Sequence, residues 1–420
     1  MFPALPARIR KRKKEKKHLI YKKLSIFIYK RENEKLYITR HLQSDIMSAE
    51  MEKRGDLYMY LKIFSFFSGS GFLDLGFETS GYDIQLVNEF SPAFMGAYKY
   101  SRDKMGLKAP AFGYANCDIN LYLDPLSSDL KKMISQAQED GSLVGFIGGP
   151  PCPDFSVAGK QRGRNGDNGK LSLSYFQLIQ AQKPSFFLFE NVKGLWRTAK
   201  HRAYYEDLKR MISDDYAMTE RLCNSIEFGA PQDRDRILLF GIRKDIKADV
   251  SDFPWEKHVI YNLEEVKSLP WPETEPFSEN SCTTCPPGIP EELTVQYWFD
   301  RNDVAHHPNA GDAFTPKAGL PKMQSIDEGD DSKKSYKRLH RWRYSPTVAY
   351  GNNEVHLHPY KARRLSVAEA MALQSLPKEF ELPPEMSLTD KFKTTGNGVP
   401  FLLARGIAST IREYLGETVK

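Results

Sequence analysis

The residue best suited to covalent chemistry is Cys152, which lies in the run Gly148–Ser156, GGPPCPDFS. The apolar stretch 143–147 leads into this run and predicts a buried strand that ends in a sharp turn. Because prolines stiffen the turn, we expect Cys152 to be held at the carboxyl end of a strand, where open α/β sheets bind ligands. Such a thiol is a candidate nucleophile, and the alternative is a buried structural cysteine.

A second set of residues is suited to holding a cofactor that contains adenosine. The apolar stretch 58–67 stops at the Gly-rich turn Ser68–Gly71, and helical spacing follows, as in a nucleotide-binding βαβ unit. Glu89 comes twenty residues after Gly69, where a carboxylate can accept hydrogen bonds from both ribose hydroxyls. The third glycine of a dinucleotide fingerprint is replaced by Asp74, whose carboxylate would repel a pyrophosphate. These residues therefore favour a sulfonium cofactor that carries no phosphate.

The remaining cysteines and histidines do not form a metal-site pattern. Cys282 and Cys285 have half of the spacing of a zinc site, but no second Cys or His pair follows at a suitable distance. His306 and His307 are a poor substitute, so we expect no bound metal. The scattered cysteines favour a reducing, cytoplasmic compartment, and no apolar run approaches the roughly 18 residues that span a bilayer.

The elements that must position these residues alternate along the chain. Strand-like stretches include 84–87, 143–147, 185–189 and 236–241, and helix-like spacing is found at 173–182 and 204–212. Strands that alternate with helices predict an α/β fold with a doubly wound, mostly parallel sheet. We assign this domain to residues 58–250.

The pattern changes after residue 250. Residues 251–345 are rich in Pro, Asp, Asn and Gly and show no βαβ rhythm, which predicts a smaller, irregular domain. Regular spacing returns within 346–420, where Ser366 and Glu369 have the spacing of a capping box at a helix start. A final helix is expected over 401–414.

Residues 1–57 form a basic arm that we expect to be partly disordered. The first forty residues contain fourteen Lys or Arg against three Glu, whereas the whole chain has a net charge of +6. The rest of the chain is therefore net negative, and the arm could add nonspecific contacts to phosphates. The alternatives are a solvated tail, or synthesis that begins at Met47 or Met51.

Six short motifs together resemble the bacterial-type DNA (cytosine-5) methyltransferase family. They follow the family's order over residues 61–413. In chain order they are Phe67–Gly71, Pro150–Cys152, Glu190–Val192, Gln232–Arg236, Arg363–Ser366 and Gly396–Gly398.

The resemblance implies a fold, a reaction and its partners. The fold is the Rossmann-like fold of adenosylmethionine-dependent methyltransferases, residues 251–345 are the target-recognition domain, and residues 346–420 return to the catalytic domain. The reaction transfers a methyl group from S-adenosylmethionine to carbon 5 of a cytosine flipped out of a specific double-stranded DNA sequence. The implied partner is that DNA, and the enzyme either accompanies a cognate restriction endonuclease or acts alone. We expect a monomer that does not bind membranes.

The resemblance also assigns catalytic roles. Cys152 adds to carbon 6 of the cytosine, and Glu190 donates a hydrogen bond to ring nitrogen 3, which requires a partly protonated carboxyl group. Arg236 contacts the target nucleotide. Arg234, two residues earlier, shares a face with Arg236 in an extended segment and could join it, or could be a solvated residue.

The cofactor is expected to contact ten residues. Of these, Glu89 would bind the ribose, Phe90 would stack on the adenine, and Asp118 with Ile119 would touch its amino edge. Phe90 and Ile119 could instead be core residues. The full set is Phe67, Ser68, Gly69, Gly71, Glu89, Phe90, Asp118, Ile119, Pro150 and Asn397.

Candidate DNA-facing residues lie after Cys152 and in a basic cluster near the end of the irregular domain, where a solvated loop is the alternative. They are Ser156, Arg162, Arg164, Lys337, Arg338 and Arg341.

Two other functions share some of these features. A family member that methylates transfer RNA would carry the same motifs, and the size of the irregular domain favours DNA. A catalytically silent DNA-binding protein would have no need for Cys152, Glu190 and Arg236, all of which are present.

Overall fold

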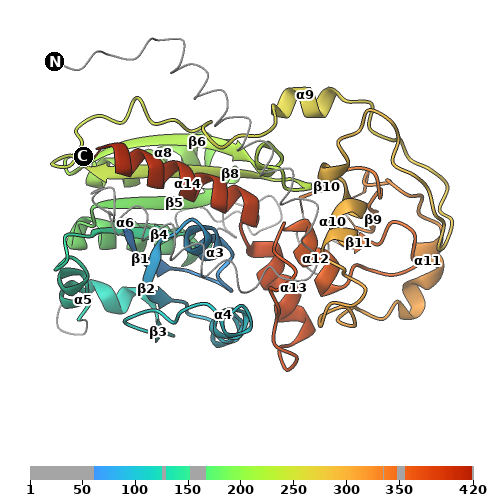
Figure 1. The fold of residues 1–420 in the computed structure, drawn as a ribbon, viewed down its shortest axis with the longest axis horizontal. Helices are drawn as coiled ribbons and strands as arrows, with labels where there is room; N and C mark the ends of the chain where they lie inside the picture. Colours follow the sequence, from blue (N-terminus) through green and yellow to red (C-terminus); the bar gives the residue numbers. More distant parts are fainter. Residues whose placement is uncertain (1–60, 125–128, 152–166, 334, 348–354, 419–420) are drawn as a thin grey trace, which may run out of the picture. The chain divides into compact units, whose positions relative to one another are not determined.

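The computed structural model describes residues 61–124, 129–151, 167–333, 335–347 and 355–418 (Figure 1). These residues belong to one compact unit of the chain. The basic arm, and with it the expected start of the first strand at residue 58, lies outside the described residues.

A seven-stranded sheet forms the centre, in the order β3-β2-β1-β4-β5-β8-β6. Its first five strands are parallel: β3 (Tyr114–Ala115), β2 (Asp83–Asn88), β1 (Leu61–Phe66), β4 (Leu143–Gly148) and β5 (Phe186–Val192). The strand β8 (Asp235–Arg243) pairs antiparallel with both β5 and β6 (Tyr216–Asn224). The predicted α/β fold with a mostly parallel sheet is confirmed.

The strand order reverses between β1 and β4, because β2 lies on one side of β1 and β5 lies beyond β4. Ligands of doubly wound sheets bind outside the carboxyl ends of the strands at such a reversal. The turn after β1 and the loop after β4 both leave the sheet at this point.

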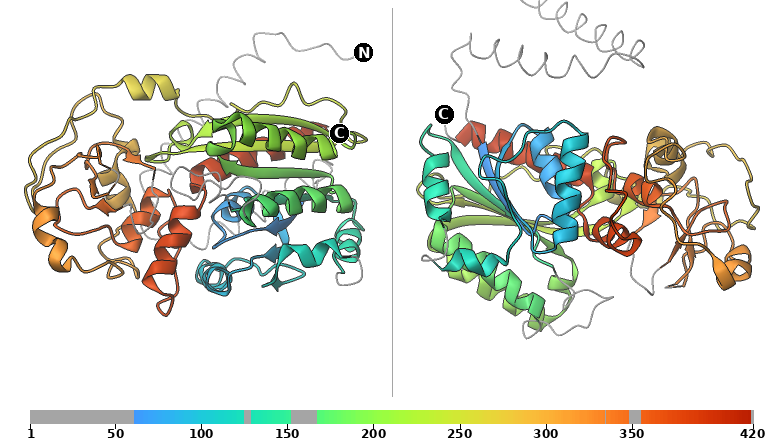
Figure 2. Two further views of the ribbon diagram at one scale, coloured as in Figure 1. Left: turned by 180° about the vertical axis from the view of Figure 1, so that it is seen from behind. Right: turned by 90° about the horizontal axis from the view of Figure 1, so that it is seen from below.

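Helices cover both faces of the sheet (Figure 2). Alternate residues of β1 point to opposite faces: Leu61 and Ile63 pack in one core, and Phe64 and Phe66 pack in the other. The first core includes residues of α3 (Phe72–Thr79), α4 (Pro92–Lys104) and α14 (Phe401–Thr418). The second includes residues of α5 (Leu130–Ala137), α6 (Asp167–Gln182) and α8 (Ala199–Ile212). The short helix α7 (Gly194–Arg197) joins β5 to α8.

Residues 251–345 contain little regular structure. Their elements are α9 (Leu263–Ser268), α10 (Val295–Arg301), α11 (Leu320–Gln324), β9 (Lys337–Arg338), β10 (Ser345–Pro346) and the 3₁₀ turns Glu291–Leu293 and Lys317–Gly319. β10 pairs with β7 (Gln232–Asp233), just before β8. β9 pairs with β11 (His356–Leu357), so the first part of 346–420 stays with the irregular region rather than returning to the sheet.

The closing helices fix the two regions to each other. α12 (Val367–Leu373) begins with the predicted capping box of Ser366 and Glu369. Its residues Ala368 and Leu373 pack with Trp298 and Leu339 of the irregular region. α13 (Leu388–Asn397) follows, and α14 then lies beside α3, with Ala404 in contact with the position of Gly76. In the part of the chain that the structure describes, no helix combines the length and apolar character needed to cross a membrane.

Candidate active site

The Gly-rich turn after β1 is held by a carboxylate from the end of β2. Gly69 and Gly71 have φ values of 57° and 82°, a left-handed conformation that glycine adopts without strain. The backbone N–H of Gly69 donates to Glu89 Oε2 at 2.8 Å, and that of Ser91 donates to Oε1 at 2.7 Å. Each carboxylate oxygen keeps a further lone pair, so Glu89 can still accept from ribose hydroxyls.

The residues around this turn connect it to β2 and to α13. The N–H of Ser68 donates to a carbonyl of β2 at 3.2 Å, and Phe67 adopts a left-handed conformation with φ 53°. Ser70 Oγ lies 2.7 Å from Thr394 Oγ1 in a buried contact. Asn397 is the last residue of α13, so this contact places the helix that ends at Asn397 against the cofactor turn.

Phe90 and Ile119 occupy different environments. Phe90 is 71 % exposed, so it is not a core residue, and its ring is free to stack on a flat ligand. Asn116 Nδ2 donates to the carbonyls of Glu89 and Phe90 at 2.7 and 3.0 Å, which fixes the backbone there. Asp118 accepts from Asn120 at the start of a 3₁₀ turn (Ile119–Leu123), whereas Ile119 is buried in the core.

Glu190 and Arg236 meet at the carboxyl end of β5. Glu190 is 8 % exposed, and its Oε1 lies 2.6 Å from Arg236 Nε. Burial raises the pKa of Glu190, and the opposing charges of Arg236 and Arg234 only partly offset that rise. A Cβ atom on Gly149 would lie 2.5 Å from Glu190 Oε2, so only glycine permits the loop after β4 to approach this carboxyl group.

Arg234 is buried and hydrogen-bonded, so the alternative that it is a solvated residue is wrong. Its Nη2 donates to the Gly396 carbonyl at 2.6 Å, next to Asn397. Asp233 and Asp235 point the other way, where Asn224 Nδ2 donates to their carboxylates at 2.6 and 2.9 Å. The predicted alternation of this segment is confirmed, and Arg234 joins it to the motif that ends α13.

The predicted nucleophile, Cys152, lies outside the described residues. Asn191 Nδ2 donates to the Pro150 carbonyl at 3.5 Å, so the loop after β4 reaches the residue next to Glu190. Pro151 is the last described residue before residue 152. The predicted residues that fall outside the described ranges are Cys152, Ser156, Arg162 and Arg164.

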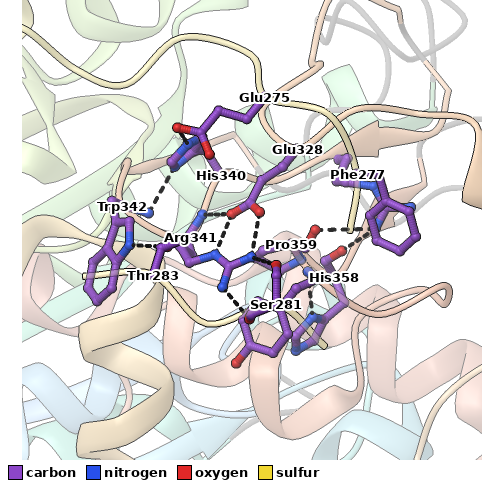
Figure 3. Close-up of polar contacts among 12 residues, drawn as sticks. Glu275, Phe277, Ser281, Thr283, Glu328, His340, Arg341, Trp342, His358 and Pro359 are labelled. Carbon is purple, nitrogen blue, oxygen red and sulfur yellow. Dashed lines mark hydrogen bonds and ion pairs between the residues drawn. The ribbon is translucent and has the colours of Figure 1, made fainter. Parts of the chain in front are cut away.

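Arg338 and Arg341 are buried, which contradicts the expectation from the sequence that they are exposed to DNA. Figure 3 shows the contacts of Arg341. Arg341 is 3 % exposed and forms a two-pronged ion pair with Glu328, with Nε–Oε1 at 2.8 Å and Nη2–Oε2 at 2.6 Å. Its Nη1 also donates to the Ser281 carbonyl at 2.6 Å. Arg338 is 0 % exposed and donates from Nε to the Ile326 carbonyl at 2.7 Å.

The donors of these two guanidinium groups are used inside the irregular region. Arg338 Nη1 also donates to the carbonyls of His358 and Lys361, at 2.5 and 3.0 Å, and Nη2 donates to that of Met323. A short run of basic residues does not reveal this, because burial depends on segments distant in sequence. Lys337, in contrast, is partly exposed.

Sequence reasoning missed a basic group on the segment that follows Glu190. Arg197, Lys200 and Arg202 are exposed and form no ion pair with any described residue. Lys193 bonds Asp235 at 2.8 Å, which places this segment beside the start of β8. The sequence does carry a signal, since four cations occur within ten residues directly after the Glu190 motif.

Among the described residues, no group of three or more His, Cys, Asp and Glu side chains is arranged to hold a metal ion. Cys282 is exposed and Cys285 is half-buried, and both are free thiols.

The chain is similar to known proteins over most of its length. A family model described as C-5 cytosine-specific DNA methylase matches residues 61–413. The Type II methyltransferase M.NmeDI of Neisseria meningitidis serogroup C is 57% identical over 356 residues, 84% of this chain and 84% of that protein. M.FnuDI of Fusobacterium nucleatum, also a Type II methyltransferase, is 29% identical over 86% of this chain and 96% of its own. The solved structure of the Entamoeba histolytica methyltransferase EhMeth has a TM-score of 0.53 at 13% identity, covering 87% of this chain and 100% of that one.

Proposed function

The chain belongs to the C-5 cytosine-specific DNA methylase family, and we propose that its active site is formed by Cys152, Glu190 and Arg236. The protein is a DNA cytosine-5 methyltransferase. The observation that carries the site assignment is the contact between Glu190 and Arg236, directly against Gly149 of the loop that leads to Cys152.

Cys152 supplies the nucleophile in this proposal. Its thiolate forms a bond to carbon 6 of the cytosine, and the electrons of the 5,6 double bond move to carbon 5. Glu190 donates a hydrogen bond to ring nitrogen 3, which makes carbon 6 more electrophilic. The raised pKa of Glu190 keeps more of the proton-donating form than an exposed glutamate would have. Loss of the carbon 5 proton after methylation expels the Cys152 thiolate and restores the ring.

Arg236 has an orienting role. Its guanidinium holds one oxygen of Glu190 and is itself buried at the start of β8. The other oxygen, Oε2, lies on the side of Gly149. The proton of Glu190 is therefore best carried on Oε2, which faces the loop of the nucleophile.

The cofactor is S-adenosylmethionine, whose sulfonium supplies the methyl group. The turn at Gly69 and Gly71, the carboxylate of Glu89 and the exposed ring of Phe90 fit the methionine, ribose and adenine parts of such a molecule. Asp118, Ile119, Pro150 and Asn397 complete the pocket in this proposal.

The target cytosine has to leave the duplex before Cys152 can reach it. We assign sequence reading to residues 251–345 and nonspecific phosphate contacts to Arg197, Lys200 and Arg202, which lie next to the active-site strand. Ser156, Arg162, Arg164 and Lys337 remain further candidates.

The named relatives support a place in a restriction-modification system. Both are Type II methyltransferases, so a cognate endonuclease that cuts the same sequence is the expected partner. We propose that the enzyme acts as a monomer on cytoplasmic DNA.

Incorporation of labelled methyl groups into host DNA and into transfer RNA tests the substrate. We expect label in DNA, at cytosine carbon 5 of one sequence motif. Label in transfer RNA alone would contradict the DNA assignment, and DNA binding without any incorporation would indicate a silent DNA-binding protein.

A further inference from the structure

A buried arginine supports the cofactor turn from behind. Arg102, near the end of α4, is 1 % exposed. Its Nη2 donates to the carbonyl of Gly71 at 2.6 Å. Gly71 is the N-cap residue of α3 and has no side chain that could fix the turn, so Arg102 fixes it from a neighbouring helix.

The guanidinium of Arg102 also forms an ion pair with Glu78 and packs on Tyr98. Its Nε and Nη2 lie 2.8 and 2.7 Å from Glu78 Oε2, in the last turn of α3. It also lies 4.3 Å from the centre of the Tyr98 ring. One side chain therefore contacts the first and last turns of α3 at the same time.

The turn at Gly71 packs directly against the side chains of Tyr98 and Arg102. A Cβ atom on Gly71 would lie 2.5 Å from Tyr98 Cε2 and 2.7 Å from Arg102 Nη2. Shortening Arg102 would therefore leave a void beneath Gly71, and the turn could move into it.

A third ionisable side chain, Asp74, belongs to the cluster of Arg102 and Glu78. Asp74 is 1 % exposed, and burial raises its pKa to about 7, although the charge of Arg102 opposes the rise. Asp74 is thus enclosed by the protein interior.

A contribution to stability alone does not account for the buried cluster of Arg102, Glu78 and Asp74. A buried ion pair is often replaceable by apolar residues without loss of stability, because desolvation offsets the attraction. Arg102 differs from a purely structural pair in that one of its donors is used by the backbone of the turn. The same turn continues to Gly69, which holds Glu89.

We propose that Arg102 is a positioning residue for the methyl donor, acting through the Gly71 carbonyl to fix the turn and, with it, Glu89. This inference rests on the proposed function of the turn. It assigns Arg102 no contact with the cofactor, so its loss changes affinity for the donor more than the rate at saturation.

Binding of S-adenosylhomocysteine by isothermal titration calorimetry tests the inference on the full chain without DNA. We expect Arg102→Gln to weaken binding about tenfold or more, as loss of a charge-assisted hydrogen bond would. KM for the donor should rise similarly, with kcat within about threefold of the wild type. Arg102→Lys keeps the charge but cannot hold both Gly71 and Glu78, and should lie in between.

Arg412 offers a matched control, because it donates to the Ser80 carbonyl at 2.8 Å, at the opposite end of α3. Arg412→Gln should lower thermal stability and leave the affinity unchanged. Wild-type affinity in folded Arg102→Gln would overturn the inference. If that variant does not fold, wild-type affinity in Arg102→Lys would do so. Failure of the wild type itself to bind S-adenosylhomocysteine would instead contradict the proposed function.

Discussion

Glu190 Oε1 and Arg236 Nε are 2.6 Å apart, although the two residues are forty-six positions apart in the chain. Their meeting depends on the antiparallel pairing of β5 with β8, in which Val192 lies opposite Arg236. The reversed strand brings its first residues to the carboxyl end of β5, the edge at which a doubly wound sheet binds ligands. The antiparallel strand thus supplies the arginine that contacts Glu190.

Glu190→Gln should slow methyl transfer by about a hundredfold, because an amide can donate only a weak hydrogen bond to ring nitrogen 3 and, unlike a carboxylic acid, cannot transfer a proton to it. DNA affinity should change little. Single-turnover rates and a DNA binding assay measure the two effects. Glu220→Gln is the control, since Glu220 lies on β6 and accepts a hydrogen bond from Tyr205. A normal rate in Glu190→Gln would refute the assigned role.

Asp74→Asn should reduce the change in the free energy of unfolding between about pH 4 and pH 7. The folded pKa of about 7 exceeds the ordinary value of 3.8, so the folded state binds more protons between these two values. Stability contributed by Asp74 is therefore present at about pH 4 and lost as the pH rises to 7, on the order of 4 kcal/mol.

Urea unfolding at several pH values measures this slope. Glu89 and Glu190 keep their own contributions in the variant, because burial also raises their pKa values. The same slope in wild type and Asp74→Asn would show that Asp74 is not protonated in the folded protein.

Arg341→Ala should destabilise the protein by roughly 3–5 kcal/mol, because it leaves the Glu328 carboxylate buried and unpaired. The double variant Arg341→Met/Glu328→Leu should recover much of that loss. The salt dependence of DNA binding should stay unchanged in the folded double variant. A reduced salt slope there would instead support a contact between Arg341 and DNA.

Replacing Arg197, Lys200 and Arg202 by Gln should reduce the slope of log affinity against log salt by about one unit for each phosphate that the variant no longer binds. Thermal stability should be unchanged, since all three side chains are exposed. Arg210→Gln at the other end of α8 is the control. Binding titrations on duplex DNA at several salt concentrations measure the slope, and equal slopes would remove this segment from the DNA interface.

The residues that sequence predicts best are those whose role is local. The turn at Gly69 and the capping box at Ser366 depend on neighbours within a few positions, and both are found as expected. The alternation of Asp233 and Arg234 likewise follows from the period of an extended strand.

Residues whose environment depends on distant segments are predicted less well. The sequence near Arg341 indicates an exposed basic cluster, but Glu328 and the loop at Ser281 enclose this side chain. Asp74 is likewise buried beside Arg102 and Tyr98 of the next helix, which the residues around Asp74 in the sequence do not indicate. Composition near a residue does not determine which remote segment covers it.

The central claim is that Cys152 attacks carbon 6, and a duplex containing 5-fluorocytosine at the target position tests it most directly. Fluorine cannot leave as a proton does, so the adduct persists after methyl transfer. The wild type should form a denaturation-resistant complex whose modified peptide contains Cys152. Cys152→Ser should form none while still binding S-adenosylhomocysteine. A covalent complex in Cys152→Ser, or an adduct on another residue, would contradict the mechanism.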